Sequence, residues 1–185
     1  MQPFHRNMFD LIESIEDCLA RHRILPCLTL LYSGIDVVAS LDRQSGESSK
    51  ASFVRWAERY LLTSRKLPCA AIDLYAARCG VVHTFTAAST LSGKRQVRLV
   101  GYAWGTAEAE KLAAAATLLQ RNDCVIHVRD LIDAFRNGVT AYLEDVEMDS
   151  TRRQKFESNV GLWFTQLDRE PVDRLLDMAK SSTKQ

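Results

Sequence analysis

The chain lacks the short motifs by which many enzyme classes are recognised. None of its five cysteines belongs to a C-x-x-C pair, and their number is odd, so neither a disulfide framework nor a tetrahedral zinc site is expected. Reduced, mostly buried thiols are the simpler expectation. H-E-x-x-H, G-x-x-x-x-G-K-[ST] and G-x-S-x-G are all missing. The sequence therefore gives no sign of a zinc protease, a P-loop protein or a hydrolase with a nucleophile elbow.

Long apolar runs are also missing. No uninterrupted apolar run approaches the roughly 18 residues that a membrane-spanning helix needs. The first 17 residues carry four acids and no continuous apolar stretch of the kind found in secretory signals. We therefore expect a cytoplasmic protein with no membrane contact.

The chain as a whole has almost no excess of either charge sign, but its two halves differ in net charge. The 185 residues are 46% hydrophobic and 25% charged, which is typical of one globular domain. The net charge is +1, made up of +4 over residues 1–98 and −3 over residues 99–185. Of the 24 cationic residues 17 are arginine, which suits phosphate recognition as well as ordinary ion pairs. This favours an anionic partner of the first half without indicating a strongly basic nucleic-acid binder.

Hydrophobic spacing predicts four helices in the first half of the chain. Their expected ranges are Met8–Arg23, Pro26–Leu41, Ser52–Thr63 and Pro68–Ala88, with a polar loop at Gln44–Lys50.

The second half combines strand-like and helical segments. Arg95–Trp104 and Cys124–Val128 are rich in strand formers, and a helix capped by Thr106 lies between them, which predicts a small β-α-β unit. Helices capped by Asp130, starting near Ser150 and starting at Pro171 should follow. The predicted fold is mainly α. Residues 1–92 form a helical bundle, and residues 93–185 add the β-α-β segment and C-terminal helices packed on the same domain.

Arg78 and His83 are the pair best suited to catalysis. Five helical positions place them about 140° apart around the axis and ~7.5 Å apart along it, so a long arginine can share a groove with the histidine. Their small neighbours Ala76 and Gly80 leave room for a ligand. Imidazole moves protons near neutral pH and guanidinium holds phosphate. The pair therefore indicates a phosphodiester site.

Asp36 is the third candidate, because it interrupts an otherwise apolar helix. A carboxylate there needs a partner if it is buried. It could orient Arg78 or His83, or it could pair with Arg43 or face solvent. Arg78 itself could instead form an internal ion pair, with Asp36 or with Asp73.

Three further residues are candidates for RNA contacts. Arg55 and Arg59 are one helical turn apart, so they could follow a phosphate backbone, although a solvated helix face is the commoner arrangement. Tyr32 lies one turn before Asp36 and is a lesser candidate.

The segment Arg78–His83 (RCGVVH) resembles the R-x4–6-H motif of HEPN domains, and Leu74-Tyr75 and Val81-Val82 are similar to HEPN sequences too. The resemblance implies a small helical bundle that forms a homodimer, with two motifs meeting in one cleft. It also implies a metal-independent endoribonuclease that needs no cofactor, of the kind found as toxins with an antitoxin partner or as antiviral effectors. Arg78 and His83 would then be the active-site pair and RNA the substrate.

Cys79 departs from the HEPN pattern, which often has Asn, Asp or His after the arginine. Two alternatives therefore stay open. One is a non-catalytic HEPN-like module that binds RNA or a protein. The other is an unrelated helical scaffold in which Arg78 is locked in a salt bridge.

Overall fold

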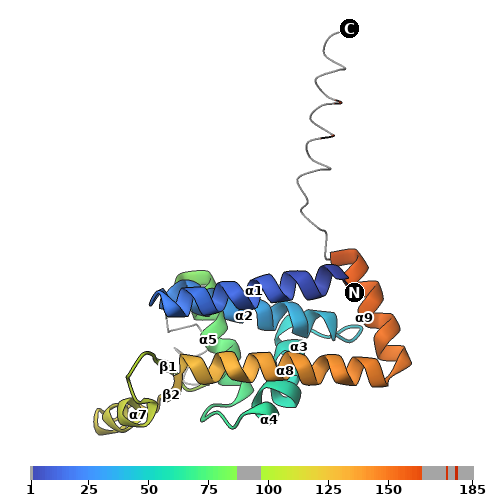
Figure 1. Ribbon diagram of the computed structural model, residues 1–185. Helices are drawn as coiled ribbons and strands as arrows, with labels where there is room; N and C mark the ends of the chain where they lie inside the picture. The colour runs from blue at the N-terminus through green and yellow to red at the C-terminus, as the bar shows by residue number, and fades with distance from the viewer. Residues whose placement is uncertain (1, 87–96, 164–173, 175–177, 179–185) are drawn as a thin grey trace.

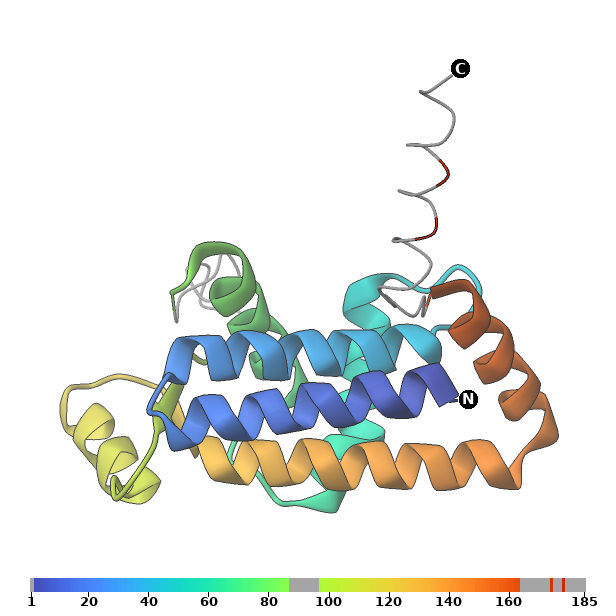
Figure 2. The ribbon, with the colours of Figure 1, turned by 45° about the horizontal axis from the view of Figure 1, so that its top comes forward.

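A computed structural model describes residues 2–86 and 97–163, together with residues 174 and 178. Three long helices lie side by side and form the body of the molecule (Figures 1 and 2): α1 (Gln2–Ala20), α2 (Ile24–Leu41) and α8 (Val128–Met148). The remaining helical elements are α3 (Ser49–Trp56), η1 (Ala57–Leu61), α4 (Leu62–Ser64), α5 (Ala71–Thr84), α7 (Ala109–Leu118) and α9 (Ser150–Trp163). The prediction of a mainly helical fold is confirmed.

One hydrophobic core runs through both halves of the chain. Its largest fully buried side chains come from the five helices α1, α2, α3, α8 and α9. They are Phe4, Tyr32, Phe53, Trp56, Phe135, Tyr142 and Phe156. Phe4 meets Phe156 edge to face at 5.1 Å between ring centroids, so the first and last described helices are in contact. Each such side chain contributes about 2–3 kcal/mol by its burial. The core does not divide at residue 92, because α8 and α9 complete the bundle.

The predicted β-α-β unit is present at one end of the long helices (Figure 1). Strands β1 (Val100–Ala103) and β2 (Cys124–His127) pair in parallel, with Val100 opposite Cys124. Parallel neighbours need a crossover connection, which α7 provides. The unit is tied to the bundle by a 2.7 Å hydrogen bond between the hydroxyls of Tyr32 and Tyr102.

The third predicted helix differs from the expected continuous α-helix. It begins at Ser49, because the Ser48 hydroxyl accepts a hydrogen bond from the Ala51 amide at 3.2 Å and caps it. It then passes through the π-helical turn η1 before α4. The backbone of this turn packs closely on α8, where Gly138 leaves room for it. Tertiary packing therefore accounts for the departure from α-helical geometry.

Two of the predicted helix caps were wrong. The helix after β2 begins at Val128, and His127 caps it by accepting a hydrogen bond from the Arg129 amide at 3.2 Å on Nδ1. Asp130 lies inside the first turn, because the strand runs into the helix without a loop. The N-cap of α7 is Glu108 and not Thr106. The start of the predicted strand at Arg95 and the helix from Pro171 lie outside the described residues.

Helix α2 is mostly apolar, with Asp36 as its one charged residue. By length and composition alone, its 18 residues are apolar enough to cross a membrane. Half of that stretch is buried inside the protein, where α2 packs against α1, α3, α5 and α8. These contacts are those of a central bundle helix.

Candidate active site

Helix α5 carries both motif residues, and its two ends are well defined. At the start, the Asp73 carboxylate accepts a hydrogen bond from the Ala70 amide at 3.0 Å. At the end, Phe85 adopts a left-handed conformation with φ +53°, and its amide donates to the carbonyl of Gly80. Arg78 therefore lies in the middle of the helix and His83 in its last turn.

Asp36 on α2 meets Arg78 and His83 on α5. Arg78 Nε donates to Asp36 Oδ2 at 2.5 Å, and Arg78 Nη1 lies 2.9 Å from His83 Nε2. The guanidinium thus bridges the carboxylate and the imidazole. Of the partners considered for Asp36, Arg78 is the one observed. Asp73 instead binds Arg98 at 2.8 Å, and Arg43 donates to Ser40 and Ser49.

The contact between Arg78 and His83 places Nε2 of the imidazole at the guanidinium. Arginine has only donors, so His83 Nε2 is the acceptor in this contact. Its lone pair is the group that a general base uses.

Burial makes the charges of this cluster more effective than they would be in water. The side chains of Arg78 and Asp36 are 20% and 24% exposed, whereas His83 is exposed. Burial raises the pKa of Asp36, and the positive charge of Arg78 opposes that rise only in part. Burial acts to lower the pKa of Arg78, but the Asp36 carboxylate outweighs it and raises that pKa. Arg78 is therefore always charged.

The guanidinium still has capacity for an anion. Its Nε and Nη1 are engaged, but Nη2 makes no hydrogen bond with any residue in the described part of the chain. Arg78 can therefore offer N–H groups to a phosphate while Asp36 holds its orientation. The exposed imidazole beside it has a ring nitrogen that can accept a proton from a hydroxyl.

The three candidate RNA contacts lie elsewhere. Tyr32 is completely buried and bonded to Tyr102, so it offers RNA no surface in this structure. Arg55 is bound by the carboxylates of Asp42 and Glu47. Arg59 donates to Asp145 at 2.7 Å. The structure therefore does not gather these side chains around Arg78 and His83, and both arginines serve in ion pairs.

An ionic network around Asp42 was not predicted from the sequence. This carboxylate is 9% exposed and lies between Arg55 of α3 and Arg152 of α9, the latter at 2.9 Å. Arg152 also donates to the hydroxyl of Tyr60 at 2.6 Å. No local pattern reveals such a network, because its members are up to 110 positions apart.

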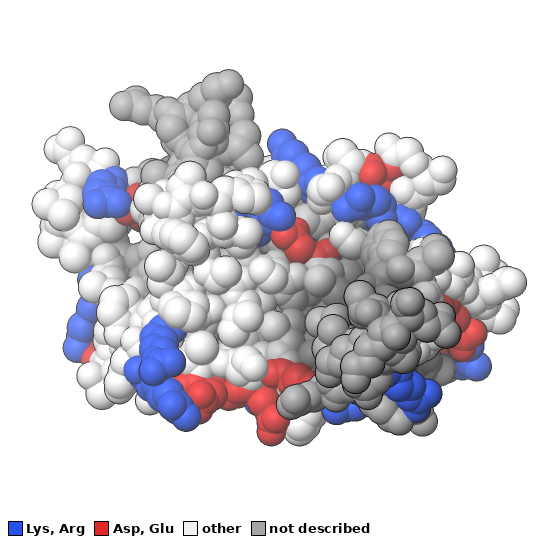
Figure 3. Space-filling view, turned by 90° about the horizontal axis from the view of Figure 1, so that it is seen from above, with Lys and Arg blue, Asp and Glu red and all other residues white. Residues whose placement is uncertain are grey.

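The face seen from above in Figure 3 has a continuous uncharged area, with Lys, Arg, Asp and Glu side chains around it.

Among the described residues, no group of three or more His, Cys, Asp and Glu side chains is placed to hold a metal ion.

Comparisons with protein-family models, curated proteins and solved structures found no significant match for this chain.

Proposed function

We propose that this protein is a metal-independent endoribonuclease of the HEPN type, with Arg78 and His83 as its catalytic residues. The observation that supports the proposal is the 2.9 Å contact between Arg78 Nη1 and His83 Nε2, with Asp36 on the other side of the guanidinium. A guanidinium cation and an imidazole are thereby held together at the surface, where a phosphodiester and its neighbouring hydroxyl can reach both.

The proposed reaction is attack of a ribose 2′-hydroxyl on the adjacent phosphorus. Arg78 shifts its Nη1 hydrogen bond from His83 to a phosphoryl oxygen and stabilises the charge that develops there. This frees His83 Nε2, which removes the proton of the 2′-hydroxyl. The P–O5′ bond breaks and the leaving oxygen takes up a proton. The products are a 2′,3′-cyclic phosphate and a 5′-hydroxyl.

Asp36 acts in this scheme as a positioning residue. Its carboxylate binds Arg78 through Nε, and not through the Nη groups that the proposed phosphate would use. Because the pair is only about a quarter exposed, water competes weakly for it. The arginine is therefore preorganised before RNA binds.

We also propose that the protein works as a homodimer, and that an antitoxin or another protein controls it. The outward side of α2 next to Asp36 supports an intermolecular contact. Leu25 and Val37 are 40% and 36% exposed there, and the partly exposed Thr29 and Ser33 lie between them. An uncharged stripe of this kind is easily desolvated by a second copy. The second copy's His83 would then be available to protonate the leaving oxygen.

A non-catalytic module that binds RNA or a protein is the second candidate. Two observations favour it. Cys79 brings only a weakly polar thiol to the motif, 4.0 Å from Arg78 Nη1. Asp36 also neutralises Arg78, so the cluster attracts phosphate less than an unpaired arginine would.

The decisive experiment compares RNA cleavage by the parent protein and by His83→Ala. We expect cleavage to fall by about 10²–10⁴-fold, which is the usual contribution of general acid–base catalysis. Circular dichroism should be unchanged, because His83 is exposed. His5→Ala, on α1, is the matched control and should cleave like the parent. EDTA should have no effect.

Three results separate the candidates. Equal cleavage by the parent and His83→Ala removes His83 from catalysis and ends the proposal. A parent that binds RNA or a protein but never cleaves RNA selects the binding module. Inhibition by EDTA indicates a metal-dependent route.

A further inference from the structure

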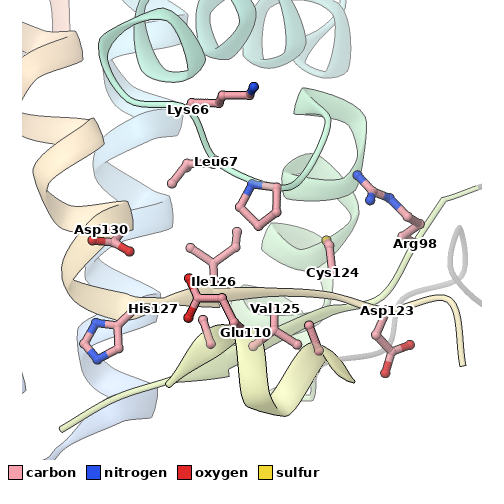
Figure 4. A pocket seen from close by; sticks show the side chains of 13 residues that line it. Lys66, Leu67, Arg98, Glu110, Asp123, Cys124, Val125, Ile126, His127 and Asp130 are labelled. Atoms are coloured by element: carbon pink, nitrogen blue, oxygen red, sulfur yellow. The ribbon is translucent and has the colours of Figure 1, made fainter. Parts of the chain in front are cut away.

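Two cavities are lined by residues other than those of the proposed active site, and the charges in their walls differ in sign. One, of about 410 Å³, lies between the β-α-β unit and the segment that leads into α5 (Figure 4). Acidic residues outnumber basic ones in its wall: Glu110, Asp123 and Asp130 against Lys66 and Arg98. The other, of about 320 Å³, has four basic residues and two acidic ones in its wall. Only the second cavity therefore suits an anion.

The four basic residues of the second cavity come from two sides of the bundle. Arg55 of α3 and Arg59 of η1 lie one turn apart, and Arg152 and Lys155 of α9 lie about one turn apart as well. We call the space that these four side chains line the basic cavity. Its walls come from segments nearly 100 positions apart in the chain, so the fold itself creates this concentration of positive charge.

The two acidic residues of the basic cavity are already engaged. Asp42 accepts hydrogen bonds from Arg55 and, at 2.9 Å, from Arg152. Asp149 accepts from the backbone amides of Thr151 and Arg152 at 2.9 and 3.1 Å, which caps α9. Both carboxylates thus have partners of their own, which reduces their repulsion of an anion in the cavity.

Several donors of the basic cavity remain available. Lys155 Nζ lies 3.4 Å from the carbonyl oxygen of Asp42 and forms no ion pair with any acid in the described part of the chain. Arg59 binds Asp145 through Nη2, and its Nε and Nη1 make no hydrogen bond with the residues described. Nε of Arg152 is likewise not used by the described residues. Both sides of the cavity can therefore donate to a ligand.

A buried hydroxyl without a partner also lines the basic cavity. Tyr142 of α8 is only 1% exposed, yet it forms part of the wall. Its hydroxyl makes no hydrogen bond with any residue that the structure describes. Buried tyrosine hydroxyls usually have such a partner. A ligand with acceptor oxygens would supply it.

We propose that the basic cavity binds the phosphate group of a small molecule. Lys155 and Arg59 donate to the phosphoryl oxygens from opposite sides, and the Tyr142 hydroxyl donates from the buried end. Charge-assisted hydrogen bonds of this kind are the strong ones. The volume of the cavity is near the lower end of the range for ligand sites, so a phosphate with a small attached group fits it.

A small molecule suits the basic cavity better than a nucleic-acid strand does. Asp145 binds both Arg59 and Arg152, so a carboxylate lies directly beside the free donors. It would repel the further phosphates of a strand, whereas a single phosphate can reach the donors. The site is separate from the proposed ribonuclease centre, because neither Arg78 nor His83 lines the cavity.

The test titrates inorganic phosphate into the isotope-labelled full-length protein at constant ionic strength and follows amide and arginine Nε–H signals by NMR. We expect saturable shifts of the Arg59 Nε–H and of the amides in the first turn of α9. Lys155→Gln should weaken this binding by about 10–100-fold, the contribution of one hydrogen bond to a charged group. Lys66→Gln, at an exposed lysine of the cavity in Figure 4, is the matched control and should bind phosphate like the parent.

Ribose 5-phosphate, with ribose as its control, identifies the source of the phosphate. Tighter binding than that of inorganic phosphate supports a phosphorylated small molecule, and equal binding supports the free anion.

Three results overturn the proposal. Shifts confined to α5 mean that phosphate binds only at the Arg78 cluster. Shifts in α9 that Lys155→Gln leaves unchanged mean that the cavity is not the site. Shifts caused by a single-stranded DNA oligonucleotide, which lacks the 2′-hydroxyl and is not cleaved, but not by phosphate mean that the cavity binds a strand.

Discussion

Asp36 is the residue on which the geometry of the proposed active site depends. It provides the ion-pair partner observed for Arg78, and that partner comes from a different helix. Because burial raises the pKa of Asp36, the cost of burying its charge offsets much of what the ion pair contributes. The pair as a whole therefore adds little net stability, but it fixes the orientation of Arg78.

At this residue we predict that Asp36→Asn lowers RNA cleavage by about 10–100-fold, because a misplaced catalytic group loses that much. The amide keeps the shape of the side chain but loses its charge. The free energy of unfolding should fall by about 1–3 kcal/mol, because the charged Arg78 stays largely buried without its carboxylate partner. Cleavage assays and urea denaturation measure both quantities. Full activity in this variant would show that Arg78 does not need Asp36.

At the scale of the elements, α8 and the backbone of η1 lie close together at Gly138, where a larger residue would meet η1. A Cβ atom at Gly138 would lie 3.1 Å from the carbonyl oxygen of Tyr60 and 3.3 Å from Cα of Leu61. These are backbone atoms, so they move only if the whole turn moves. The π-helical turn and the glycine opposite it therefore form one structural feature.

We predict that Gly138→Ala destabilises the protein by about 1–3 kcal/mol, because overpacking outweighs the gain in helix propensity. Gly161→Ala, on α9, is the matched control. Apart from its own helix backbone, no atom of the residues that the structure describes lies within 4 Å of its added Cβ, so this variant should be stabilised by up to about 1 kcal/mol. Urea denaturation compares the two. Equal stability of the two variants would show that η1 moves away at little cost.

At the scale of the whole molecule, ion pairs link the two halves of the chain in addition to their shared hydrophobic core. Arg59 and Arg65 of the basic first half pair with Asp145 and Asp130 of the acidic second half. In the opposite sense, Glu16 on α1 binds Arg129 on α8 at 2.5 Å. The charge asymmetry that suggested an anionic partner is thus used partly inside the fold. This leaves the Arg78 cluster as the more specific indication of a phosphate ligand.

Another ion pair, between Glu47 and Arg55 in the first half of the chain, makes the stability of the molecule depend on pH. Hydrogen bonds from Arg55, at 2.9 and 3.0 Å, lower the pKa of Glu47 to about 2. The unfolded chain takes up this proton near the ordinary glutamate value, whereas the folded protein stays ionised to a lower pH. The stabilisation by Glu47 is therefore complete above pH ~4.5 and is lost as the pH falls toward ~2.

We predict that Glu47→Gln lowers the free energy of unfolding at pH 7 by about 1 kcal/mol, as expected for a hydrogen-bonded pair near the surface. Its stability should also decline less than that of the parent between pH 4.5 and 2. Denaturation curves at several pH values measure this. Glu58→Gln is the control, because Glu58 is exposed and forms no ion pair with any residue described. If the parent and Glu47→Gln decline equally, Arg55 does not hold Glu47 in solution.

The sequence by itself determined the helices and the position of the motif. Hydrophobic spacing is a local property, so it predicted α1, α2, the β-α-β unit and the helix carrying Arg78 and His83. The interval between those two residues already allowed them to share one groove. Local signals also explain the boundaries that were missed, since Ser48 and His127 cap their helices with side chains that could have been recognised.

Only the tertiary structure decided which helix faces meet. It chose Asp36 over the other partners considered for Arg78, buried Tyr32 and placed α8 in the bundle core. Each of these pairings joins positions tens of residues apart, and many alternative partners have the same chemistry. Burial and close packing select among them, because one arrangement covers the apolar faces and pairs the buried charges together.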